Sequence, residues 1–116
     1  MRMMLKSKIH RATVTKTDLD YEGSIGIAED LLSAADILPY EQVHVLDISN
    51  GARLETYAIS EACGSGTVAL YGAAAYLVRP GDRVIILAYQ PVTDAEAQAV
   101  QPRVVYLDEN NVPQPS

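Results

Sequence analysis

Short apolar runs separated by turn residues dominate this chain, and most of them are too short for stable helices. β-Branched residues in partial alternation predict strands at residues 8–15, 24–27, 43–48, 53–59, 67–71, 83–88 and 104–107. Helix formers with paired leucines or alanines predict two short helices, at residues 28–35 and 94–99. Many short strands and little helix indicate a mainly β domain, and the pattern favours a small closed barrel.

Turn signals mark the boundaries between these strands. Asn50-Gly51 predicts a two-residue β-hairpin that joins the strands at residues 43–48 and 53–59. Because alternate side chains of a strand point to the same side, Arg53, Glu55 and Tyr57 share one face of the returning strand. This face is either an exposed polar surface or a site on which a guanidinium and a phenol converge.

Length and composition limit the chain to one domain. It has 116 residues, of which 48% are hydrophobic, so we assign residues 1–107 to a single barrel. Residues 108–116 are polar and contain prolines, and we expect them to form a flexible tail. No apolar run reaches the length of a signal peptide or of a membrane span, which predicts a cytoplasmic protein with no membrane partner.

The charges are unevenly distributed. The net charge is −6, yet five of the nine basic residues fall in the first sixteen positions, namely Arg2, Lys6, Lys8, Arg11 and Lys16. This segment is either a solvated basic strand or part of a positive pocket for an anionic ligand. Nucleic acid is a poor candidate ligand, because the negative chain repels phosphate and contains no phenylalanine or tryptophan for base stacking.

The single cysteine argues against two further classes of site. Cys63 has no partner for an internal disulfide, and only His10 and His44 accompany it as soft metal ligands. We therefore expect no metal site, and a cysteine nucleophile is not favoured. The role of Cys63 stays open.

The Gly23-Ser24 step has two readings. A glycine-serine pair between periodic segments is an ordinary turn. Glycine also reaches strained backbone angles and leaves its carbonyl unshielded, so the hydroxyl of the next serine can attack that carbonyl and form an ester. The small residues at 72–75 likewise allow two readings: a tightly packed barrel corner, or a loop whose N–H groups face an oxyanion.

Five sequence blocks that occur in one order favour the second interpretation of Gly23-Ser24, in which the serine hydroxyl attacks the glycine carbonyl. They are residues 6–15 (KSKIHRATVT), 21–24 (YEGS), 50–53 (NGAR), 56–59 (TYAI) and 72–75 (GAAA). Together they resemble the pyruvoyl-dependent aspartate 1-decarboxylase family over about residues 1–107. The resemblance implies a six-stranded double-psi β-barrel, a homotetramer with sites at subunit interfaces, and decarboxylation of L-aspartate to β-alanine for pantothenate and coenzyme A synthesis.

The resemblance also implies how the electron sink is made. Loss of CO2 from an amino acid leaves an electron pair at the α carbon, which a ketone joined to the substrate nitrogen as a Schiff base can accept. This chain has no glycine-rich phosphate loop for pyridoxal phosphate. In the family, the serine attacks the preceding glycine carbonyl, the ester eliminates, and hydrolysis leaves a covalent pyruvoyl group. Here that implies autocatalytic cleavage between Gly23 and Ser24, with the pyruvoyl group derived from Ser24.

Further roles follow from positions that match the family. Tyr57 matches the tyrosine that reprotonates the substrate carbon, so the implied catalytic residues are Ser24 and Tyr57. The implied processing residues are Gly23, Ser24, Thr56 and His10. The implied substrate-binding residues are Lys8, Arg53, Thr56, Gly72, Ala73 and Ala74, of which Lys8 and Arg53 hold substrate carboxylate.

Two positions depart from the family. Tyr71 stands where asparagine usually precedes Gly-Ala-Ala, and Tyr76 where histidine is common. We expect the Tyr71 ring to lie at a loop edge, turned outward or packed at a subunit interface, with slow or incomplete self-processing. Two alternatives stay open: an uncleaved, non-catalytic oligomeric barrel that binds an acidic metabolite, and a pyruvoyl decarboxylase that prefers glutamate. The sequence does not say whether maturation needs a partner protein.

Overall fold

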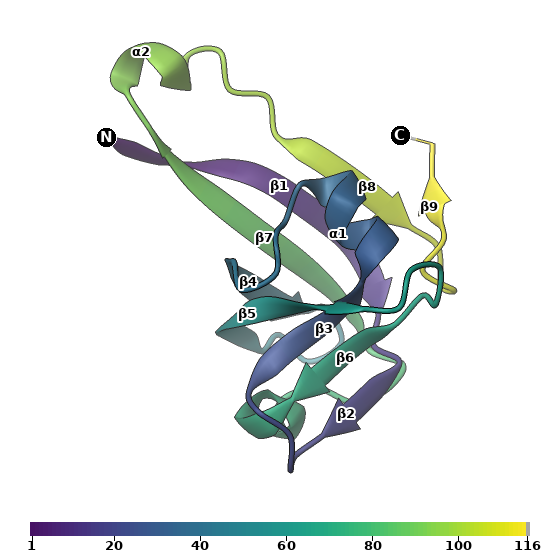
Figure 1. Cartoon of the computed structure of the whole chain (residues 1–116). Helices are drawn as coiled ribbons and strands as arrows, with labels where there is room; N and C mark the ends of the chain where they lie inside the picture. Colours follow the sequence, from purple (N-terminus) through teal and green to yellow (C-terminus); the bar gives the residue numbers. More distant parts are fainter. Residues whose placement is uncertain (116) are drawn as a thin grey trace.

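The computed structural model describes residues 1–115, and most of its ordered elements are strands (Figure 1). In chain order the elements are β1 (Arg2–Thr13), β2 (Lys16–Asp18), β3 (Ser24–Ala28), α1 (Glu29–Ala35), β4 (Gln42–Asp47), β5 (Arg53–Glu61), β6 (Val68–Tyr71), the 3₁₀ helix η1 (Gly72–Tyr76), β7 (Arg83–Val92), α2 (Asp94–Ala97), β8 (Arg103–Leu107) and β9 (Pro113–Gln114). The mainly β class with short helices is therefore confirmed. Within residues 1–115, every helix is too short or too polar to cross a membrane.

The strands form one mixed sheet in the order β2-β6-β3-β5-β4-β7-β1-β8-β9. The N-terminal segment pairs near both ends of this strand order. β1 pairs with β7 and β8 near one end, and β2 pairs with β6 at the other. Thr15, between β1 and β2, also donates from its backbone N–H to the Val68 carbonyl at 2.8 Å. Because one continuous segment joins both sides, the sheet curls into a closed shape.

The strand count differs from the six that the resemblance implies. The sheet has nine strands, of which β2 and β9 span only three and two residues. Three pairs are parallel, β1 with β8, β2 with β6, and β3 with β5, and the other pairs are antiparallel. This mixture is consistent with a double-psi barrel to which short edge strands have been added.

The hydrophobic core explains the alternation seen in the sequence. In β4, Val43 and Val45 are fully buried while the intervening His44 is half-buried. β3 is buried along its whole length, because Ile25 and Ile27 face the core and the alternate positions carry small side chains. Helix α1 covers the core with Leu31, Leu32 and Ala35, and it ends at a left-handed residue shortly before Pro39.

The β4–β5 hairpin forms as predicted, but its loop is longer than two residues. Residues 48–52 separate the two strands, and the Asp47 N–H donates to the Ala52 carbonyl at 2.8 Å. Asn50 accepts the Ala52 N–H with its side chain, and Gly51 has a φ of 77°. A side-chain bond at Asn50 thus replaces the tight turn that the dipeptide suggested.

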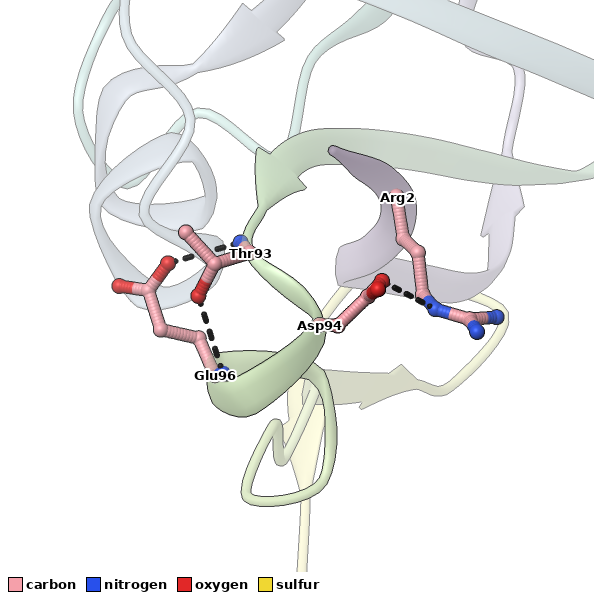
Figure 2. A network of polar contacts seen from close by, with 4 residues as sticks. All are labelled: Arg2, Thr93, Asp94 and Glu96. Carbon is pink, nitrogen blue, oxygen red and sulfur yellow. Dashed lines mark hydrogen bonds and ion pairs between the residues drawn. The ribbon is translucent and has the colours of Figure 1, made fainter.

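β1 and β7 extend further than their hydrophobic runs predicted. They pair antiparallel from Arg2 opposite Val92 to Thr13 opposite Arg83, and α2 follows β7 directly. Helix α2 begins with a capping box, in which Thr93 accepts from the Glu96 N–H and Glu96 accepts from the Thr93 N–H (Figure 2). Asp94 in its first turn pairs with Arg2 at 2.8 Å, so the helix is linked to the start of β1 (Figure 2).

Residues 108–115, which the sequence predicts to be a flexible tail, make contacts with the barrel. Asn111 is 5% exposed, and its side chain bonds the Thr13 backbone in both directions and donates to the Gly66 carbonyl at 2.8 Å. β9 then pairs antiparallel with β8. A polar side chain of this segment therefore forms hydrogen bonds with backbone groups at the end of the barrel, a role that composition alone does not reveal.

Candidate active site

Gly23 and Ser24 lie at the transition from an exposed loop to a buried strand. Gly23 is exposed, whereas Ser24 is the first residue of β3 and is only 1% exposed. The Ser24 hydroxyl donates to the Glu22 carbonyl at 3.0 Å. For this hydroxyl to attack the Gly23 carbonyl, its hydrogen bond to Glu22 must break and the Ser24 side chain must change rotamer.

Gly72 packs directly against Gly23. It has a φ of 72°, and a Cβ added to it would lie 2.6 Å from the Gly23 Cα and 2.8 Å from the Gly23 nitrogen. No side chain fits at that distance, and the backbone angle also favours glycine. The start of η1 therefore holds the chain at Gly23 by close backbone contact.

A cavity of about 430 Å³ opens beside Gly23. β5 and η1 supply most of its wall, which consists of Gly23, Leu54, Glu55, Thr56, Tyr57, Tyr71, Ala73, Ala74 and Leu77. Five residues that the sequence assigned to processing, catalysis or substrate binding thus meet at one cavity, namely Gly23, Thr56, Tyr57, Ala73 and Ala74. Its volume is sufficient for a small amino acid.

Arg53 lies next to this cavity and not in its wall. It lines a neighbouring space of about 310 Å³ with His44, Leu46, Leu54 and Glu55, the last two of which line both spaces. The register pairs Arg53 with Leu46 and Glu55 with His44, and Glu55 Oε1 lies 3.3 Å from His44 Nε2. Arg53 is exposed and has no ion-pair partner within residues 1–115.

Lys8 and His10 are not brought to the Gly23-Ser24 step within one chain. Both lie in β1, and β7, β4 and β5 separate β1 from β3 in the sheet. The His10 ring contacts Tyr106 edge to face at 5.6 Å, and its Nδ1 atom is buried without a partner among the described residues. Burial lowers the pKa of His10, and the nearby positive charges of Lys8, Arg11 and Arg83 lower that pKa further.

The expectation that the Tyr71 ring lies at a loop edge and turns outward is wrong, whereas slow self-processing stays a prediction. Tyr71 is the last residue of β6 and is 4% exposed, so its ring neither turns outward nor sits at a loop edge. Its hydroxyl donates to Glu61 Oε2 at 3.2 Å. Glu61 was not among the predicted site residues. It lies beyond the strand that was predicted to end at Ile59, and its carboxylate occupies the space left by the missing side chain of Gly26.

Comparison with known proteins identifies the family. The family model described as aspartate decarboxylase matches residues 1–114. A protein named "Aspartate 1-decarboxylase" from Moorella thermoacetica (strain ATCC 39073 / JCM 9320) is 60% identical over 110 residues, which cover 95% of this chain and 86% of the relative. This chain belongs to the aspartate decarboxylase family. Membership confirms the resemblance drawn from the five sequence blocks.

Proposed function

We propose that this chain decarboxylates L-aspartate to β-alanine and CO2, with a pyruvoyl group made from its own Ser24. The observation that carries the proposal is the meeting of Gly23, Thr56 and Tyr57 at one cavity, with Gly72 packed against the Cα and nitrogen of Gly23. Family membership supports the same activity. The product serves pantothenate and coenzyme A synthesis, and we place the enzyme in the cytoplasm.

Self-processing begins at the Gly23–Ser24 peptide bond. The Ser24 hydroxyl attacks the Gly23 carbonyl carbon, the C–N bond breaks, and the resulting ester joins Gly23 to the Ser24 side chain. Removal of the Ser24 α proton then expels the Gly23 carboxylate, and water releases ammonia to leave the ketone. Thr56 in the cavity wall is the side-chain hydroxyl that we assign to assisting the first step.

The residues around Gly23 fit such a group. Ser24 is shielded from solvent at the start of β3, whereas the cavity opens beside Gly23. Cleavage would free the chain end at Gly23, next to this cavity. When formed, the pyruvoyl ketone supplies the electron sink that decarboxylation needs. Tyr57 is half-buried in the same wall, and its phenol is the group that we assign to returning a proton to the substrate carbon.

Substrate binding requires positive charge, which we assign to Arg53 and Lys8. Neither is ion-paired within residues 1–115, so both can meet a substrate carboxylate. Three strands separate Lys8 from Ser24 in one chain, so we assign the Lys8 of a neighbouring subunit to each site. This arrangement fits a homotetramer with its sites at subunit interfaces.

Two other functions compete with this proposal. An uncleaved barrel that only binds an acidic metabolite is not favoured, because the chain matches a family of decarboxylases along almost its full length. A preference for glutamate is the nearer alternative, since both substrates carry a second carboxylate. Family membership favours aspartate, because the family and the similar protein are both named for aspartate decarboxylation.

The assay follows amino acid products from purified protein incubated separately with aspartate and with glutamate. We expect β-alanine from aspartate, little γ-aminobutyrate from glutamate, and neither product from Ser24→Ala. A protein that acts faster on glutamate would refute the substrate assignment. Equal turnover by Ser24→Ala would refute the role of Ser24.

A further inference from the structure

The hydrogen bond between Tyr71 and Glu61 joins two strands that flank β3. Tyr71 ends β6 and Glu61 ends β5, and β3 lies between these strands in the sheet. The phenol oxygen and Glu61 Oε2 are 3.2 Å apart. The bond therefore crosses over β3 at Gly26, two residues after Ser24.

The position of each partner follows from the register. Tyr71 is directly opposite Ser24, and cross-strand partners of an antiparallel pair carry their side chains on the same face. Gly26 is on that face as well, and a Cβ added to it would lie 2.9 Å from the Glu61 side-chain carbons and still closer to Oε2. The Tyr71 ring thus extends along β3 from Ser24 to the space above Gly26, where its hydroxyl meets the carboxylate.

Tyr71 also contacts the chain before the scissile bond. Its ring lies 4.7 Å from the Tyr21 ring between centroids, and the Lys16 Nζ lies 5.5 Å from the Tyr71 centroid. The next residue, Gly72, packs on Gly23. One side chain therefore touches the segments on both sides of the bond between Gly23 and Ser24.

The Glu61 carboxylate has an unusual environment for a purely structural group. It is half-buried, and its only hydrogen-bond partner among residues 1–115 is the Tyr71 phenol, with no cation in ion-pair distance. Burying a carboxylate without a cation costs free energy. Burial and the Glu61 charge raise the pKa of Tyr71, so the phenol stays protonated and donates.

We propose that Glu61 is a positioning residue for self-processing and acts through Tyr71. Its charged oxygen fixes the position of the Tyr71 phenol. The fixed ring then keeps Ser24 and the Tyr21 loop, which lie on either side of the bond to be cleaved, in a constant relative position. This inference rests on the proposed cleavage at Gly23–Ser24. It assigns a task to the residue that replaces the family asparagine, and to a carboxylate that no family motif named.

The test is a time course of fragment appearance after a short pulse of cell-free synthesis, for the full chain and three variants. We expect Glu61→Gln and Tyr71→Phe each to slow cleavage about ten-fold, the scale of losing one charge-assisted hydrogen bond. Because Glu61 acts through the phenol, the double variant should be no slower than the slower single variant. Glu109→Gln, at an exposed carboxylate far along the chain, should cleave at the parent rate.

Stability is measured separately in a Ser24→Ala background, where every chain stays whole. We expect Glu61→Gln to melt within a few degrees of the Ser24→Ala parent in this background. A much lower melting temperature, a double variant with multiplied rate losses, or a Glu61→Gln chain that cleaves at the parent rate would each overturn the positioning role. A parent chain that never cleaves would instead refute the proposed cleavage itself.

Discussion

Gly72 leaves no room for a side chain where it meets Gly23. The distance from its imagined Cβ to the Gly23 Cα is 2.6 Å, and both its neighbours in this contact are backbone atoms that cannot move aside as a flexible side chain would. The backbone conformation at Gly23, where we propose cleavage, therefore requires a glycine at the start of η1. Its two small neighbours, Ala73 and Ala74, then line the cavity.

Gly72→Ala should abolish or severely slow cleavage, because the new methyl group displaces Gly23 from its place beside the cavity. The matched control is Gly64→Ala, since Gly64 has a similar φ of 76° but nothing within 4 Å of an added Cβ. That control carries only the backbone cost of about 1–2 kcal/mol and should cleave normally. Equal cleavage of both variants would show that the contact with Gly23 does not matter.

Arg53→Ala should leave cleavage intact and reduce kcat/KM for aspartate by roughly 30- to 1000-fold, the scale of losing one partner of a buried charge pair. The reason is that Arg53 adjoins the cavity with its charge free for a carboxylate. Steady-state kinetics with Arg103→Ala, an exposed arginine of β8, as control would measure this. Unchanged kinetics would remove Arg53 from substrate binding.

Tyr57→Phe should process normally yet form β-alanine roughly 10²–10⁴-fold more slowly, because it keeps the ring in the cavity wall and loses the proton donor. Single-turnover product formation separates this effect from binding. Tyr106→Phe in β8 is the control, as its ring contacts His10 and lies outside the cavity. A near-normal rate in Tyr57→Phe would assign protonation to another group.

Tyr71→Asn restores the family residue, and the sequence alone predicts that it speeds cleavage. The burial and the hydrogen bond of Tyr71 support the opposite expectation, because asparagine cannot fill the buried space of the ring or reach Glu61. We expect slower cleavage and a loss of about 2–4 kcal/mol in unfolding free energy, the scale of a large-to-small core substitution. Denaturant melts in the Ser24→Ala background check the second part, and faster cleavage would contradict the first.

His10 should make stability depend on pH. Its folded pKa is below the ordinary value of 6.5, so the unfolded chain binds the proton more readily. Above this value both states are neutral and there is no effect, whereas stability falls as the pH drops below it. Unfolding of the parent and of His10→Gln between about pH 7.5 and about pH 5.5 should show a shallower loss in the variant. Parallel curves would mean that His10 titrates alike in both states.

The local sequence pattern was sufficient to predict where the strands lie along the chain. It was not sufficient to predict which strands lie side by side in the sheet. Alternation in residues 43–48 and the Asn50-Gly51 signal predicted a hairpin that exists, because a hairpin depends on nearby residues. The insertion of β3 between β5 and β6 depends on contacts between distant segments, which periodicity does not encode. For that reason the burial of Tyr71 opposite Ser24 was not foreseen.

The candidate site was predictable only in part for the same reason. Thr56 and Tyr57 were found through the family blocks, and they meet Gly23 because β5 lies beside β3. Lys8 came from the same blocks but lies three strands away within the chain, and sequence matching does not say which subunit supplies a residue. Glu61 belongs to no block, and it is identified by its hydrogen bond to Tyr71 and by the space that Gly26 leaves for it.

The intact mass of the purified protein is the most direct test of the claim that Ser24 becomes the reactive group. We expect two chains, one ending at Gly23 and one beginning at position 24, the second lighter than a serine-ended chain by the mass of ammonia. Ser24→Ala should give one whole chain. A single unmodified chain from the parent protein after prolonged incubation, or a second fragment that still begins with serine, would show that Ser24 does not become a pyruvoyl group.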